Sequence, residues 1–132
     1  MIGIIVATHS RLAHELLQAA EMIIGPFALV EPVSIDREIS LDTAKQQLQQ
    51  SFDRVSEDGD GVIILTDIFG GTPTNISAEF LAVKQVEILT GVNLPMLLKC
   101  INARRGMPVD ELTGMLKDYA RNAVMRPSEL LG

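Results

Sequence analysis

Two short, unbroken apolar runs constrain the fold of this chain most strongly. Residues 2–8 read IGIIVAT and residues 61–67 read GVIILTD, and both runs are rich in β-branched side chains. A strand that is apolar on both faces is typical of the middle of a parallel sheet, where helices cover each face. The two runs are therefore predicted to be central strands that lie next to each other.

Helical patterns and weaker strands alternate with these runs. Apolar residues recur at helical spacing over 12–24 and 41–55, and Ser40 is placed to cap the second of these helices. The segment 28–35 is predicted to be an edge strand, because Pro32 cannot donate a ladder hydrogen bond. The remaining expected elements are a helix over 73–83, a strand over 85–91, helices over 93–104 and 108–123, and a short strand over 123–128.

This alternation determines the predicted fold class. Strands separated by helices form right-handed βαβ crossovers, which gives an α/β fold with a mostly parallel open sheet flanked by helices on both faces. The chain has 132 residues, no internal repeat and no Gly/Ser- or Pro-rich linker, so residues 1–132 are predicted to form a single domain. In such sheets, ligands bind beyond the carboxyl ends of the strands, where the strand order reverses.

A histidine and a carboxylate occupy corresponding positions at the ends of the two apolar runs. The first ends in Thr8-His9-Ser10 and the second in Thr66-Asp67. If the strands are neighbours, His9 and Asp67 converge, and the carboxylate bonds to one ring nitrogen and makes the other more basic. The alternative is that both residues only end a strand or cap a turn. Their matched placement favours the functional pair.

Residues suited to binding an anion flank this pair. Ser10 and Thr72 are each placed to cap a following helix, and Gly70 and Gly71 allow the backbone to approach a ligand closely. Two helix N-termini that face one point form an anion site. A histidine, a carboxylate and an anion site together predict a histidine that accepts a phosphoryl group.

Several other kinds of site lack essential parts. The chain contains no Gly-x4-Gly-Lys-Ser/Thr motif, and no Gly-x-Gly-x-x-Gly motif follows the first strand. A receiver domain that binds magnesium should have acidic residues after the first strand, where this chain has Thr8-His9-Ser10. Because His14 is the only other histidine, no metal site is predicted, and no cofactor is expected.

Charge and cysteine content narrow the partners and the compartment. The chain has 11 Lys and Arg against 17 Asp and Glu, and this net charge of −6 disfavours nucleic acid and anionic membrane surfaces. The single cysteine, Cys100, is predicted to be a buried apolar residue that forms no internal disulfide. With no export leader and no membrane-spanning run, a cytoplasmic protein without direct membrane insertion is expected.

Three segments, taken in order, resemble the IIA component of the mannose-type sugar phosphotransferase system. They are IIVATHSRLA, VIILTDIFGGTPTN and LTGVNLPMLL, and together they extend the resemblance over nearly the whole chain. The resemblance implies a four-stranded parallel sheet and a homodimer that exchanges a C-terminal strand, which would be the segment 123–128 here. It also implies that His9 accepts a phosphoryl group from the carrier protein HPr and passes it to a histidine of a IIB component, with Asp67 on the other ring nitrogen.

By this resemblance the chain is a protein-histidine phosphotransferase with a phosphohistidine intermediate, and its IIB partner is a separate chain. Backbone or hydroxyl groups of Ser10, Gly70, Gly71 and Thr72 would stabilise the phosphoryl group. The family often has glycine where this chain has Ser10, and serine there also occurs in the dihydroxyacetone kinase phosphotransfer subunit. Three alternatives remain: that subunit, a phosphorylatable regulatory module without sugar transport, and a domain in which His9 only contacts an anion. The sequence names no sugar.

Overall fold

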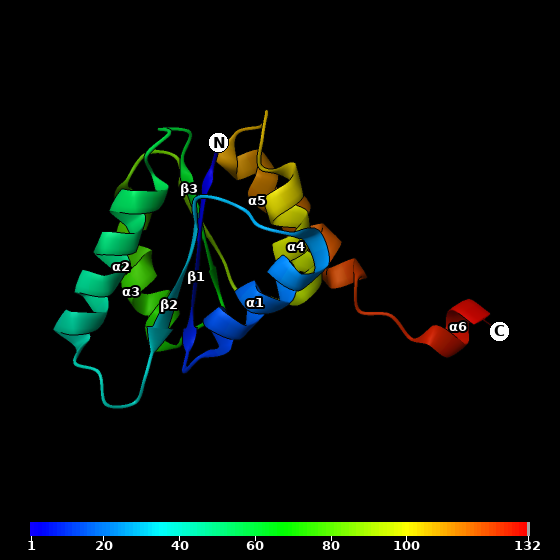
Figure 1. Ribbon diagram of the computed structural model, residues 1–132, viewed down its shortest axis with the longest axis horizontal. Helices are drawn as coiled ribbons and strands as arrows, with labels where there is room; N and C mark the ends of the chain where they lie inside the picture. Colours follow the sequence, from blue (N-terminus) through cyan, green and yellow to red (C-terminus); the bar gives the residue numbers. More distant parts are fainter. Residues whose placement is uncertain (132) are drawn as a thin grey trace.

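The computed structural model describes residues 1–131, and its helices and strands follow one another largely as the sequence pattern predicts (Figure 1). The strands are β1 (Gly3–His9), β2 (Val30–Ile35), β3 (Val62–Thr66) and β4 (Val86–Leu89). The helices are α1 (Leu12–Ile24), α2 (Leu41–Val55), α3 (Thr72–Ser77), the 3-10 helix η1 (Ala78–Ala82), α4 (Leu94–Ala103), α5 (Val109–Asn122) and α6 (Pro127–Leu131).

The four strands form one parallel sheet in the order β2-β1-β3-β4. The two apolar runs are the central neighbours β1 and β3, as predicted, and β2, with Pro32, is an edge strand. In the register, Ala7 of β1 lies opposite Thr66 of β3, and His9 lies opposite Ile35 of β2. The strand order reverses between β1 and β3, so the carboxyl ends of these two strands mark the predicted ligand position.

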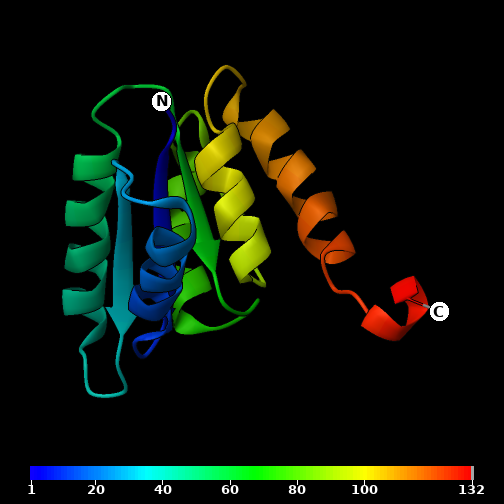
Figure 2. The ribbon, with the colours of Figure 1, turned by 45° about the vertical axis from the view of Figure 1, so that its right-hand side comes forward.

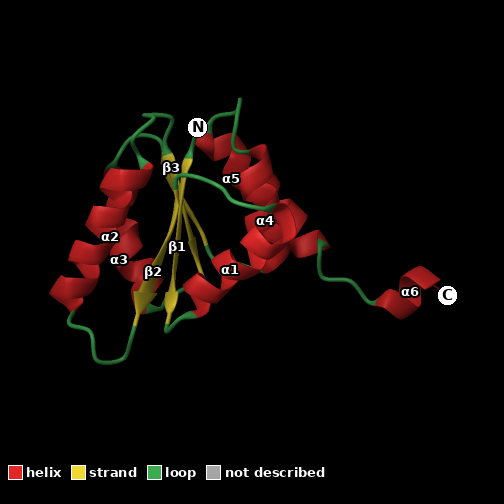
Figure 3. Cartoon of the chain, viewed as in Figure 1, coloured by secondary structure: helices red, strands yellow, loops and turns green. Residues whose placement is uncertain are grey.

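Helices cover both faces of the sheet (Figure 3). Helices α1, α4 and α5 pack on one face, while α2, α3 and η1 pack on the other. Alternate residues of β1 enter the two layers: Ile4 and Val6 join the first, Ile5 and Ala7 the second, and all four are fully buried. This two-sided burial explains why the run contains no polar alternation. The central strands are therefore packed from both sides as far as Thr8 and Thr66, and His9 follows at an exposed strand end.

The opposite, amino-terminal edge of the sheet is closed by Arg104, just after α4. Its side chain is buried and donates hydrogen bonds to the backbone carbonyls of Ile2, Ala28 and Leu29. Burial lowers the pKa of this guanidinium, and the nearby Cys100 works in the opposite direction. Cys100 itself is buried as predicted, and burial raises the pKa of its thiol to about 12, which makes the thiol chemically inert in the folded protein.

Two expected elements differ in the structure. The helix predicted over 73–83 is α-helical only to Ser77 and continues as a 3-10 helix. The strand predicted over 123–128 is wrong for this chain on its own: residues 124–126 are irregular and α6 follows. A strand forms only where its backbone groups meet a neighbouring strand, and no strand of residues 1–131 lies beside this segment. Figures 1 and 2 show α6 standing away from the body of the protein.

No helix within residues 1–131 combines the length and the apolar character that crossing a membrane requires.

Candidate functional site

The predicted convergence of His9 and Asp67 is confirmed. His9 is the last residue of β1, and Asp67 directly follows β3, which is the neighbouring strand. One carboxylate oxygen of Asp67, Oδ2, lies 2.8 Å from His9 Nδ1 and also accepts the backbone N–H of His9 at 3.0 Å. The two residues are 58 positions apart in the sequence and meet only because their strands pair.

The carboxylate of Asp67 is held in its ionised form by this geometry. Burial by itself raises the pKa of Asp67, but the hydrogen bonds from the ring and backbone of His9 outweigh it, so the pKa lies below its ordinary value. The other oxygen, Oδ1, accepts the backbone N–H of Ile68 at 3.1 Å. An ionised acceptor on Nδ1 favours the tautomer with the proton on that nitrogen, which leaves Nε2 free to react.

The loop after β3 is fixed by buried hydroxyl groups that sequence reasoning missed. The hydroxyls of Thr66 and Thr74 lie 2.7 Å apart, and Thr74 Oγ1 donates to the carbonyl of Ile68 at 2.6 Å. Thr66 is fully buried and Thr74 nearly so. These bonds join the end of β3 to α3 across the turn that contains Gly70 and Gly71. The sequence signal that could have indicated these bonds is a pair of threonines, Thr66 at the end of the strand and Thr74 in the first turn of the following helix.

Gly71 packs directly against the imidazole ring. A Cβ atom at this position would lie 2.7 Å from His9 Cε1, closer than Cβ atoms approach other atoms in proteins, and 3.3 Å from His9 Nε2. Gly70 has a φ of +86°, a conformation that glycine adopts without strain. The paired glycines therefore have separate functions: one turns the backbone, and the other makes room for the histidine ring.

If His9 accepts a phosphoryl group, as the sequence predicts, replacing Gly71 by alanine is expected to slow that transfer about tenfold, because the new methyl group displaces the ring from its position beside Asp67. The fold should survive, since the displaced atoms belong to a side chain that is half exposed. The matched control is Gly114→Ala in α5, where a Cβ atom meets nothing within 4 Å. Single-turnover kinetics and thermal unfolding of both variants test this, and equal transfer rates would contradict it.

Ser10 does not cap α1, contrary to the prediction. Its φ is +52°, and its backbone N–H donates to the carbonyl of Ile35 at 3.0 Å. The N-cap position falls on Arg11, which makes no side-chain cap, and the N–H of Ala13 bonds instead to Thr8 Oγ1 at 2.7 Å. A positive φ at this position suits glycine better than serine.

Thr72 does not cap α3 either. It is the first residue of that helix, and the N-cap is Gly71, which has no side chain to offer. Thr72 instead lines the cavity beside His9. Each predicted cap misses by one residue, because the N-cap of α1 falls one residue after Ser10 and the N-cap of α3 one residue before Thr72. The prediction that both residues lie near His9 is confirmed.

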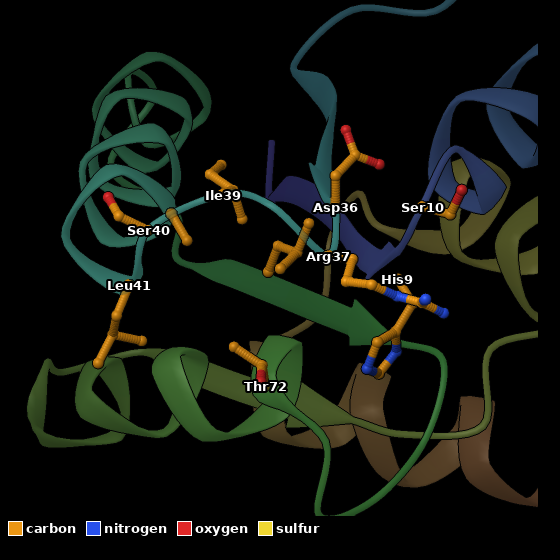
Figure 4. Close-up of a pocket in the computed structure, with 10 residues that line it drawn as sticks. His9, Ser10, Asp36, Arg37, Ile39, Ser40, Leu41 and Thr72 are labelled. Carbon is orange, nitrogen blue, oxygen red and sulfur yellow. The ribbon is translucent and has the colours of Figure 1, made fainter.

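An open cavity of about 460 Å³ lies between the end of β1, the β2–α2 connection and the start of α3 (Figure 4). His9, Ser10 and Thr72 contribute to its wall, together with Asp36, Arg37 and Ser40 from the β2–α2 connection. Sequence reasoning missed the last three residues as site residues, because nothing in their spacing links them to the strand ends. In residues 1–131, no three His, Cys, Asp or Glu side chains form a group that could hold a metal ion.

Comparison with known proteins gives a consistent result. Residues 3–117 match the family model described as the PTS system fructose IIA component. The fructose-specific EIIA component of Bacillus subtilis is 30% identical over 132 residues, which are 99% of this chain and 90% of that protein. The mannose-specific EIIAB component of Escherichia coli K12 is 30% identical over 125 residues, 93% of this chain but only 38% of that longer protein.

A solved structure agrees with these relatives. The crystal structure of phosphotransferase system component EIIA from Streptococcus agalactiae superposes with a TM-score of 0.87 at 26% identity, over 98% of this chain and 99% of that one. The match covers the sheet and the helices on both of its faces. The chain therefore belongs to the mannose/fructose family of IIA components of the sugar phosphotransferase system.

Proposed function

We propose that this chain carries a phosphoryl group on Nε2 of His9, accepting it from phosphorylated HPr and passing it to a histidine of a IIB component. The observation that carries the proposal is the 2.8 Å contact between Asp67 Oδ2 and His9 Nδ1, which directs the other ring nitrogen to react. Membership of the IIA family implies phosphotransfer, and His9 is the candidate acceptor at the strand ends.

Transfer between two imidazoles needs no change of oxidation state. The lone pair of His9 Nε2 forms an N–P bond while the N–P bond to the donor imidazole breaks, and the donor ring keeps that electron pair. Positive charge then spreads over the phosphorylated His9 ring, and the ionised Asp67 beside Nδ1 stabilises it. Catalysis is mostly positioning, since the ring is held at a strand end before the donor arrives.

The phosphoryl oxygens need hydrogen-bond donors on the Nε2 side of the His9 ring, opposite Asp67. We propose that backbone N–H groups of Gly70 and Gly71, with groups of Ser10 and Thr72, serve this purpose. Gly71 lies against the ring, and Ser10 and Thr72 line the same cavity. Such fixed donors stabilise a transferring group without the cost of reorganisation.

The direct test is transfer from purified, phosphorylated HPr to the full chain. The expected result is one acid-labile phosphoryl group per chain, detected by mass spectrometry, and its onward transfer to a IIB component. A chain that stays unlabelled by a donor that phosphorylates another IIA component would overturn the proposal. Loss of sugar uptake on removal of the gene would assign the transfer to transport, and normal uptake would assign it to regulation.

We also propose a homodimer in which residues 123–128 pair as a strand with a second copy. Val124 is 81% exposed and Met125 is 65% exposed in the single chain, and the outer side of the edge strand β4 pairs with no strand of residues 1–131. Covering this apolar segment favours association. Sedimentation equilibrium should give a dimer for the native chain and a weaker dimer for Val124→Asp. A monomeric native chain contradicts the proposal.

A further inference from the structure

The cavity beside His9 contains one basic side chain that the proposed function has not yet used. Arg37 lies in the connection between β2 and α2 and lines the same cavity as His9 (Figure 4). Among the residues that line this cavity, Arg37 is the only lysine or arginine. Figure 4 shows its side chain running toward His9, while the carboxylate of neighbouring Asp36 points away.

Arg37 has no structural partner within residues 1–131. It takes part in none of the ion pairs there, although Asp36 and Glu38 flank it in the sequence. Arg54, by contrast, is bound through two nitrogens to the carboxylate of Glu31, and Arg104 is tied to three backbone carbonyls. Arg54 and Arg104 therefore bond to groups of the fold itself, whereas the guanidinium of Arg37 is available to a ligand.

The backbone holds Arg37 close to the reacting histidine. His9 lies opposite Ile35 in the register of β1 and β2, and the N–H of Ser10 donates to the carbonyl of Ile35 at 3.0 Å. Arg37 follows Ile35 by two residues. The start of the β2–α2 connection is thus attached to the turn after His9, and this attachment places Arg37 at the cavity.

The chemistry of the transferred group matches this placement. A phosphoryl group in transfer spreads negative charge over its three outer oxygens, and a guanidinium pairs with two such oxygens at once. We propose that Arg37 binds the phosphoryl group carried on His9, holding its oxygens and stabilising their charge as the N–P bonds form and break. This inference rests on the proposed phosphoryl transfer to His9 and adds a catalytic residue to it.

The experiment compares Arg37→Gln with Arg37→Lys and with Arg105→Gln. Arg105 is an exposed arginine after α4, next to Arg104 at the amino edge of the sheet, so its replacement removes the same charge far from His9. Single-turnover transfer from saturating phosphorylated HPr should slow about tenfold in Arg37→Gln and less in Arg37→Lys, with Arg105→Gln unchanged. All variants should unfold at the wild-type temperature, because Arg37 and Arg105 are exposed and take part in no ion pair within residues 1–131.

A spectroscopic readout separates contact with the phosphoryl group from simple attraction of the donor. The ³¹P chemical shift of phosphorylated His9 should change in Arg37→Gln and stay at the wild-type value in Arg105→Gln. A wild-type rate and shift in Arg37→Gln would overturn the inference, and so would a defect that disappears at saturating donor. If the wild-type chain takes up no phosphoryl group, the proposed function itself fails. If the wild-type chain is phosphorylated and Arg37→Gln is phosphorylated equally fast, only the role of Arg37 fails.

Discussion

Replacing His9 by alanine is expected to abolish phosphorylation of the chain by phosphorylated HPr. Within residues 1–131, the imidazole of His9 is the only side chain at the strand ends that combines a free ring nitrogen with a carboxylate on the other nitrogen. Alanine leaves no atom able to form the N–P bond. The fold should remain, because the side chain of His9 is half exposed and the core residues of β1 before it are unchanged. Mass spectrometry under conditions that preserve acid-labile phosphate gives the measurement.

The chain provides its own control for this variant. His14, the only other histidine, lies in α1 and lines a different pocket at the β2 edge, so His14→Ala should take up the phosphoryl group normally. Acid-labile phosphate remaining on His9→Ala would remove His9 from the mechanism. Failure of both variants would point to a shared effect on the fold, which unfolding curves measure directly.

Replacing Asp67 by asparagine is expected to slow transfer by roughly 10–100-fold. Both carboxylate oxygens accept N–H donors: Oδ2 from the ring and backbone of His9, and Oδ1 from Ile68. An asparagine has one acceptor oxygen, so its NH₂ group must face an N–H donor in either orientation. The variant also loses the negative charge beside the ring. The transfer rate, measured at saturating donor, should fall while His9 is still labelled.

The stability of this variant carries a pH signature. Because the folded protein lowers the pKa of Asp67 below its ordinary 3.8, the carboxylate adds stability above that value and loses it as the pH falls through the folded-state pKa. Denaturant unfolding should therefore separate wild type from Asp67→Asn at neutral pH and bring them together at strongly acid pH. Asp118→Asn, on the exposed side of α5, is the matched control. An unchanged transfer rate in Asp67→Asn would exclude Asp67 from the mechanism.

Most of the fold could be predicted because its signals are local and periodic. The run from Ile2 to Thr8 is apolar without interruption, and only a strand covered on both faces accommodates that composition. The edge position of β2 could be predicted from Pro32, because proline has no backbone N–H to donate to a neighbouring strand. Ser40 was correctly predicted as a helix cap, since capping depends on a residue only three positions away.

The failed predictions depend on backbone geometry or on distant residues. The positive φ of Ser10 removes its hydroxyl from the cap position, and composition does not reveal such a turn when the residue is not glycine. The buried role of Arg104, about which no prediction was made, likewise depends on the carbonyls of Ile2, Ala28 and Leu29, which are more than 70 residues away in the chain. The segment 123–128 lacks a neighbouring strand within the described residues, so its strand propensity is not expressed.

The sequence by itself determined the α/β class, the central position of the two apolar strands and the convergence of His9 with Asp67. These results follow from residue periodicity and from the rule that neighbouring parallel strands end at one edge. Only the tertiary structure decided which oxygen of Asp67 contacts His9 Nδ1, that Gly71 makes room for the His9 ring, and that Arg37 lines the same cavity as His9. Such contacts join residues far apart in sequence, and their distances are set by how the layers pack rather than by any local pattern.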